Sequence, residues 1–202
     1  MEHPAPRLIL ASQSPTRARL LASAGLRFET KPARIDEDAV KQAAQAEDAS
    51  AAEAALLLAD MKAQRAGAGD GTALVIGADQ ILVCDERWFS KSQDGAEARA
   101  QLLTLRGRPH ELVTAVVCHR DGRRVWHHVA TPRLLVRHFS ETFLDEYIAA
   151  EGDALTDSVG GYRLEGAGIQ LFDRVEGDYF SVLGLPLFPL LGFLRQHGAL
   201  AT

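Results

Sequence analysis

The feature that most constrains the fold is a short apolar run that passes directly into a helix start near the amino terminus. Leu8–Ala11 has the composition of a buried strand, and Ser14 followed by Pro15 is typical of a helix N-cap with proline at the first helical position. Gly25 then supplies a helix stop. A strand that leads into a helix without a long loop is typical of α/β folds.

The same alternation of strand and helix signals continues along the chain. Ser50 and Glu53 have the spacing of a capping box, ahead of an alanine- and leucine-rich stretch that reaches Arg65. A second buried strand, Leu74–Ala78, is predicted to end at Asp79. The later elements are predicted as a helix at 95–105, hairpin strands at 111–119 and 124–128 around Asp121-Gly122, a strand at 133–138, a helix at 140–150 and a helical segment at 184–197.

This order of elements predicts a mixed α/β fold with a twisted central sheet, and two lobes around a cleft are compatible with it. No internal repeat or low-complexity linker divides the chain, so we expect a single domain over residues 1–202.

Composition narrows the class of protein. With 202 residues, 47% of them hydrophobic and 24% charged, the chain should bury roughly 70% of its unfolded surface without disulfides or a structural metal. Cys84 and Cys118 lie in apolar, strand-like surroundings without CxxC spacing, so we expect buried thiols in a reducing compartment. A net charge of -5 argues against stable nucleic-acid binding. No apolar run is long enough for a membrane span and no signal peptide is recognisable, which predicts a cytoplasmic protein.

The segment around the first predicted helix start has the groups needed to bind phosphate. Ser12, Ser14 and Arg17 would bring hydroxyls, backbone N–H groups and a guanidinium to one helix N-terminus. An ordinary serine cap with an exposed arginine explains the same residues, and the segment alone leaves both interpretations open.

Acidic residues supply a second candidate feature. Asp79, at the predicted end of a buried strand, could activate water or hold a metal, or could merely cap a turn. Glu37 lies in an acidic run that is most simply a solvated loop, although divalent cations do need oxygen ligands of this kind. Lys62 and Lys91 could bring positive charge to a bound triphosphate, or could simply be exposed.

Several common nucleotide and hydrolase motifs are missing from the sequence. It contains no GxxxxGK[ST] loop, no complete GxGxxG fingerprint and no GxSxG elbow. No HExxH pair indicates a histidine metal site. Phosphate chemistry would therefore need another scaffold.

Four segments, taken in order, resemble the Maf family of nucleotide pyrophosphatases over nearly the whole chain. Shorter matches are Lys62, Lys91, Arg108-Pro109-His110 with Thr114, and the segments 176–178 and 182–186. The four main segments are LILASQSPTRARLL from Leu8, Ile35-Asp36-Glu37, Val75–Gln80 and Gly160–Gly166.

The resemblance implies a Maf fold similar to that of inosine triphosphatases, with a sheet and two lobes around a cleft, and a homodimer. It implies hydrolysis of nucleoside triphosphates to the monophosphate and pyrophosphate. By position, Asp79 matches the proposed general base and Glu37 an acidic residue associated with a divalent metal, Mg²⁺ or Mn²⁺. The matching polar and basic cleft residues are Ser12, Arg17, Lys62 and Lys91.

Departures from the commonest Maf pattern bear on the substrate. Thr16 stands where many members have arginine, Gln80 where they have threonine, and Glu165 where they have glutamine. The pair Gln80 and Glu165 looks like the branch acting on 7-methyl-GTP rather than the branch that prefers dTTP and UTP. A carboxylate would favour the positively charged methylated guanine. Ser158 also replaces a frequent lysine, and Ser92 follows Lys91 where proline is usual.

A non-catalytic alternative stays open, because the family is linked with inhibition of septum formation. The chain could be a nucleotide-binding regulator of cell division on the same fold. Asp79, Glu37, Arg17 and both cleft lysines are all present, and a protein that only binds would not need the complete set. The sequence therefore favours the enzyme.

Overall fold

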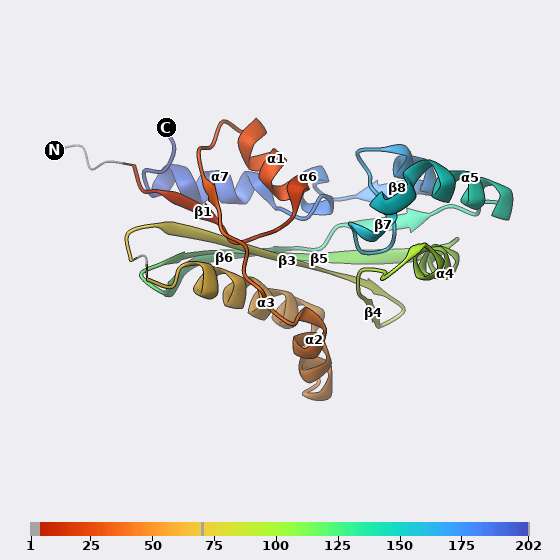
Figure 1. Ribbon diagram of the computed structural model, residues 1–202, viewed down its shortest axis with the longest axis horizontal. Helices are drawn as coiled ribbons and strands as arrows, with labels where there is room; N and C mark the ends of the chain where they lie inside the picture. Colours follow the sequence, from red (N-terminus) through yellow and green to blue (C-terminus); the bar gives the residue numbers. More distant parts are fainter. Residues whose placement is uncertain (1–4, 70, 202) are drawn as a thin grey trace. The chain divides into compact units, whose positions relative to one another are not determined.

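The computed structural model describes residues 5–69 and 71–201, and in that part of the chain eight strands form one mixed sheet accompanied by seven α-helices (Figure 1). The strands are β1 Leu8–Leu10, β2 Glu29–Thr30, β3 Leu74–Cys84, β4 Arg87–Phe89, β5 Pro109–Arg120, β6 Arg123–Ala130, β7 Arg133–Val136 and β8 Phe172–Glu176. The helices are α1 Pro15–Ser23, α2 Glu37–Ala46, α3 Ala51–Ala66, α4 Gly95–Leu105, α5 Glu141–Glu151, α6 Tyr179–Val182 and α7 Leu187–Gln196, with 3-10 turns η1 Gly152–Thr156 and η2 Ala167–Leu171. The predicted mixed α/β fold is confirmed.

The sheet combines parallel and antiparallel pairs. Its main path runs β2-β1-β3-β5-β7-β8, with β4 paired to β3 and β6 paired to β5. The strand β1 is parallel to both of its neighbours, β2 and β3. The pairs β3 with β4, β5 with β6, β5 with β7 and β7 with β8 are antiparallel.

The chain forms two compact units, and β3 and β5 each contribute to both. The first unit is drawn from Met1–Gln80, Thr114–Ala130 and Gly184–Thr202, and the second from Ile81–Val113 and Thr131–Leu183. The expected single domain over residues 1–202 and the expected cleft between two lobes stay predictions.

In the first unit, helices cover both faces of the sheet. Figure 1 shows α1 and α7 over one face and α3 over the other. Trp126 of β6 stacks on Phe193 of α7 with ring centroids 5.0 Å apart. On the α3 side, a Cβ at Gly77 would overlap the carbonyl oxygen of Ala59, so the absent side chain lets α3 lie directly against β3.

The second unit has its own apolar core. Side chains of α4, α5, η1 and the strands pack there around the fully buried Leu102, Leu144 and Leu171. Within this core, the His110 ring meets Tyr162, and Nε2 of the histidine lies 2.7 Å from the tyrosine hydroxyl.

Most predicted elements are present. Ser14 caps α1 with Pro15 in its first turn, the Ser50–Glu53 capping box opens α3, and Asp121-Gly122 links the antiparallel β5 and β6. Cys84 and Cys118 are both buried free thiols, as expected, and burial raises the pKa of each. No helix in residues 5–69 and 71–201 is long and apolar enough to span a membrane.

Two predictions were wrong. Asp79 does not end its strand, because β3 continues to Cys84, where its last residues pair with β4. The acidic run at Glu37 is not a solvated loop, because Asp36 caps α2 and accepts a hydrogen bond from the Ala39 N–H at 3.0 Å. Acidic residues in a first helical turn interact favourably with the helix dipole, which explains why this run starts a helix.

Candidate active site

A buried lysine between two carboxylates forms the centre of the candidate site. Lys62 Nζ lies 2.6 Å from Glu37 Oε1 and 2.6 Å from Asp79 Oδ1. The side chains of Lys62 and Asp79 are 8% and 4% exposed, whereas that of Glu37 is 42% exposed. Charges so deeply buried are stable only when paired, and this arrangement provides the pairing for Lys62 and Asp79.

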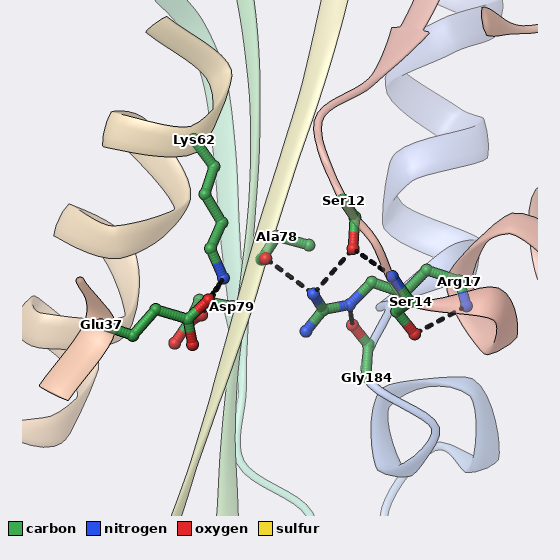
Figure 2. Close-up of polar contacts among 8 residues, drawn as sticks. All are labelled: Ser12, Ser14, Arg17, Glu37, Lys62, Ala78, Asp79 and Gly184. Carbon is green, nitrogen blue, oxygen red and sulfur yellow. Dashed lines mark hydrogen bonds and ion pairs between the residues drawn. The ribbon is translucent and has the colours of Figure 1, made fainter. Parts of the chain in front are cut away.

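The backbone explains why these side chains meet. Asp79 has the same side-chain direction along β3 as Gly77, so it points toward α3, which carries Lys62. Figure 2 shows Glu37 and Lys62 reaching the Asp79 carboxylate from the same side of β3. The close approach of α3 at Gly77 therefore sets the distance between the lysine and the carboxylate.

Asp79 is also only partly satisfied. Its Oδ2 is buried and has no hydrogen-bond partner in the described part of the chain. Burial raises the pKa of Asp79, and the nearby Glu37 adds to the rise, while Lys62 and Arg17 oppose it. A carboxylate with a raised pKa and an unbonded oxygen is suited to accept a proton from water.

Glu37 behaves differently from Asp79. Burial favours a higher pKa for Glu37, but the attraction of Lys62, the hydrogen bond from Lys62 and the charges of Lys41 and Arg17 together lower its pKa. Lys41 lies one helical turn after Glu37 on α2 and is 7% exposed. Glu37 thus stays ionised more readily than Asp79.

A second polar group surrounds the guanidinium of Arg17. Its Nε donates to the Gly184 carbonyl at 2.7 Å, and its Nη1 donates to the Ala78 carbonyl at 2.8 Å and to Ser12 Oγ at 3.3 Å. Ser14 Oγ caps α1 by accepting from the Arg17 N–H at 3.3 Å, and the Ser14 N–H donates to Ser12 Oγ at 3.1 Å. Ser14 is therefore a helix cap, and Arg17 ties the start of α1 to β3 and to the Gly184 segment.

Arg17 and Asp79 meet β3 from different sides (Figure 2). The strand β1 ends at Leu10, and the last backbone bond to β3 runs from the Ala11 N–H to the Ile76 carbonyl at 2.8 Å. The Ala78 carbonyl, two residues further, is bonded by Arg17 instead. Both polar groups thus lie just past the carboxyl end of β1, the position where ligands collect in open α/β sheets.

The predicted specificity residues of the first unit have separate surroundings. Gln80 follows Asp79 and its Nε2 donates to Thr114 Oγ1 of β5 at 2.7 Å. Thr114 is fully buried, so this bond fixes the Gln80 amide. Thr16 lies in the first turn of α1, where Arg19 Nη2 is 3.4 Å from its Oγ1.

Two predicted site residues belong to the second unit. Lys91 is exposed and forms an isolated antiparallel bridge with Val159. Glu165 is exposed and contributes to raising the pKa of Arg163, whose main partner is Glu151. Their roles next to a substrate stay predictions.

The second unit also has a cavity of about 510 Å³, but it contains none of the predicted site residues. Both arginines in its lining are paired with carboxylates, because Arg133 contacts Glu111 at 2.6 Å and Arg174 contacts Glu176 at 3.0 Å. The two carboxylates beside Lys62 are the better candidate for chemistry.

Two carboxylates of the first unit have the chemistry to hold a divalent cation. Nowhere in residues 5–69 and 71–201 do three or more His, Cys, Asp or Glu side chains gather as a metal site. Mg²⁺ commonly takes only one or two carboxylates, with water and phosphate oxygens completing its shell. The carboxylates of Asp79 and Glu37, which Lys62 bridges, could supply that number of oxygen ligands.

Sequence reasoning missed two features of this site. Lys41 was not a candidate, although Glu37 and Lys41 have the four-residue spacing of a helical ion pair. The Gly184 carbonyl, which accepts from Arg17, carries no sequence signal because any residue offers the same group.

The fold and the site together define an α/β protein with a buried carboxylate–lysine cluster and a basic, serine-rich helix start at the end of a parallel strand. The model of the family described as Maf-like protein matches residues 7–197. The chain therefore belongs to the Maf family.

Close relatives agree with this assignment. A protein of Granulibacter bethesdensis named nucleoside triphosphate pyrophosphatase is 60% identical over 97% of this chain and 100% of its own length. A protein of the same name from Paramagnetospirillum magneticum is 53% identical, over 95% of this chain and 99% of its own. A protein of Rhizobium meliloti named 7-methyl-GTP pyrophosphatase is 48% identical, over 96% of this chain and 98% of its own.

Proposed function

We propose that this chain is a nucleoside triphosphate pyrophosphatase that hydrolyses the bond between the α- and β-phosphates, releasing a monophosphate and pyrophosphate. The observation that carries the proposal is the buried Asp79, with one carboxylate oxygen held by Lys62 and the other without a partner in the described residues. The names of the three relatives described above support the proposal. Two are named nucleoside triphosphate pyrophosphatase and one 7-methyl-GTP pyrophosphatase.

In this mechanism water attacks the α-phosphorus in line with the departing pyrophosphate. Asp79 Oδ2 accepts the proton of that water or orients it. In the nucleotide-free protein, Lys62 holds the other oxygen of the same carboxylate. A positioned general base of this kind contributes about 10²- to 10⁴-fold to the rate.

Glu37 and Asp79 would hold the divalent cation, Mg²⁺ or Mn²⁺. Such a cation supplies Lewis-acid stabilisation of phosphate oxygens when it is bound. The lowered pKa of Glu37 supports this role, because a cation ligand has to be ionised.

Positive side chains would neutralise the charge that develops on the leaving pyrophosphate. Arg17 uses Nε and Nη1 to fix itself to the backbone, which leaves Nη2 to donate to a phosphate oxygen. Lys62 and Lys91 are the two further positively charged side chains that we assign to the triphosphate. Ser12 and Ser14 lie at the start of α1, the helix that carries Arg17.

We further propose a preference for 7-methyl-GTP. Gln80, held by Thr114, would face the base, and the Glu165 carboxylate would attract its positive charge. The Rhizobium relative with that substrate in its name supports the assignment. The cytoplasmic location and the homodimer stay predictions from the sequence and the resemblance.

Product analysis tests the reaction. Purified protein with Mg²⁺ is incubated with 7-methyl-GTP, GTP, dTTP, UTP and CTP, and phosphorus products are separated. We expect pyrophosphate and monophosphate. Orthophosphate with a diphosphate would contradict the bond selectivity, and nucleotide binding without any turnover would favour the non-catalytic regulator.

The same panel tests the base preference. In the Glu165→Gln variant, we expect the ratio of kcat/KM for 7-methyl-GTP over GTP to fall about tenfold, which corresponds to the loss of about 1.4 kcal/mol of attraction to the methylated base. GTP is the matched control because it differs only in the methyl group and its charge. An unchanged ratio, or a wild-type preference for dTTP and UTP, would remove the assignment.

A further inference from the structure

The ammonium group of Lys62 occupies a position that a divalent cation would also favour. It contacts one oxygen of Glu37 and one of Asp79, each at 2.6 Å. A hard cation such as Mg²⁺ is commonly bound through one or two carboxylates together with phosphate oxygens and water. The lysine thus already does, with a single charge, what a divalent cation would do between these side chains.

Lys62 and a divalent cation would repel each other at this position. The side chains of Lys62 and Asp79 are 8% and 4% exposed, so little water is available to screen like charges. Lysine has a long flexible stem with a compact charge at its end, so its ammonium can move while its helix stays fixed. The lysine can therefore give way without any change in the fold.

We propose that Lys62 holds the place of the divalent cation in the nucleotide-free protein and moves from the two carboxylates to phosphate oxygens when cation and nucleotide bind. This inference rests on the proposed function, because the triphosphate supplies the anion that receives the lysine. It follows that the cation alone binds weakly and that nucleotide and cation strengthen each other's binding.

Mn²⁺ binding to the full chain without nucleotide tests the proposal. Free Mn²⁺ is measured by its electron paramagnetic resonance signal at constant salt. The Lys62→Gln variant removes the competing charge and should bind Mn²⁺ at least about tenfold more tightly than the wild type. Equal or weaker binding, or no binding by either protein, would overturn the proposal.

Lys41→Gln is the matched control. It removes one positive charge from a buried lysine that also acts on Glu37, but the ion pairs that bridge Glu37 and Asp79 remain. We expect a clearly smaller gain in Mn²⁺ affinity than in Lys62→Gln. Equal gains would mean that charge removal alone explains the effect, and the place-holding role would be wrong.

The wild-type protein gives a readout that does not depend on a variant folding. Side-chain ammonium groups are followed by ¹H–¹⁵N nuclear magnetic resonance while Mg²⁺ and inorganic tripolyphosphate are added. The Lys62 signal should shift as Mg²⁺ binds, together with the ¹³C carboxylate signals of Glu37 and Asp79. Carboxylate shifts with an unchanged Lys62 signal would overturn the proposal.

Neither measurement involves turnover, so the two proposals can fail separately. Tighter Mn²⁺ binding by Lys62→Gln in a protein that releases no pyrophosphate would keep the place-holding role and reject the proposed function.

Discussion

Asp79 in the first unit and His110 in the second are both buried, and each has one side-chain atom without a hydrogen-bond partner in the described residues, but they differ in charge. In the first unit, Asp79 is paired with Lys62 and keeps Oδ2 without a partner in the described residues. In the second, His110 bonds Tyr162 through Nε2 and keeps Nδ1 without one. The first pair carries charge, whereas burial lowers the pKa of His110 to about 4 and so keeps that ring neutral.

The difference separates the site that we propose for chemistry from a group that serves packing. A neutral histidine inside an apolar core needs no counterion, and it lies among the aromatic rings of Tyr162 and Phe172. A buried charged pair stabilises a fold poorly compared with apolar packing, so a functional role is the better explanation for Lys62 and Asp79. The two groups also respond oppositely to acid, because the pKa of Asp79 is raised and that of His110 is lowered.

Replacing the carboxylate of the first unit should have the largest effect. Asp79→Asn keeps the shape but cannot accept a proton, so we expect turnover to fall about 10²- to 10⁴-fold. Pyrophosphate release on the preferred substrate measures the loss, and circular dichroism verifies the fold. Full turnover in a folded Asp79→Asn protein would show that another group activates the water.

Protonation of His110 in the second unit should change the free energy of unfolding rather than the turnover. Between its folded pKa of about 4 and the usual unfolded value of about 6.5, the unfolded chain binds more protons. His110 should therefore lower the free energy of unfolding by about 3 kcal/mol as the pH falls from about 7 to about 4.

Urea unfolding across this pH range, compared between the wild type and His110→Gln, measures the contribution of His110. The slope that the variant loses belongs to the histidine. If both proteins show the same pH dependence, His110 is not the buried neutral group that we describe.

Gly77→Ala should lower both the free energy of unfolding and the turnover, each by less than the two effects described above. The added Cβ would overlap the Ala59 carbonyl and push α3, with Lys62, away from β3. Overpacking of this kind lowers the free energy of unfolding by about 1 to 3 kcal/mol. Gly192→Ala in α7 is the matched control, since its Cβ would meet nothing within 4 Å.

In the Gly192→Ala control, turnover should stay unchanged. The free energy of unfolding should rise by about 0.5 to 1 kcal/mol, because alanine has a higher helix propensity than glycine. Thermal unfolding and pyrophosphate release on both variants make the comparison. Normal turnover in Gly77→Ala would mean that the contact between α3 and β3 does not set the position of Lys62.

The smallest effects should come from the helix caps of the two units. Ser50 caps α3 in the first unit and Ser140 caps α5 in the second. Replacing either with alanine should cost about 1 kcal/mol of unfolding free energy without changing turnover per folded molecule. A turnover loss confined to Ser50→Ala would show that the start of α3 also matters for the site.

Local signals in the sequence predicted the elements whose ends depend on near neighbours. The Ser50–Glu53 capping box and the Asp121-Gly122 turn specify their structures within four residues. The extent of β3 could not be predicted in the same way, because its continuation past Asp79 depends on pairing with β4. That pairing joins separate strands, and the apolar run Leu74–Ala78 gives no indication of it.

The site was predictable only as a set of residues. The resemblance to Maf proteins pointed to Glu37, Lys62 and Asp79, and the structure brings these three together. Their ion pairs could not be predicted, since Glu37 was interpreted as part of a loop and not as the start of α2. The attachment of Arg17 to the carbonyls of Ala78 and Gly184 also depends on residues far apart in the sequence.

Hydrolysis in H₂¹⁸O tests most directly that the Asp79 cluster directs water to the α-phosphorus. Wild-type protein and Asp79→Asn are incubated with the preferred triphosphate and Mg²⁺, and the products are analysed by ³¹P nuclear magnetic resonance and mass spectrometry. We predict that the wild type places one ¹⁸O in the monophosphate and none in the pyrophosphate, at a rate that Asp79→Asn cannot match. Label in the pyrophosphate, or equal rates for the two proteins, would contradict the account.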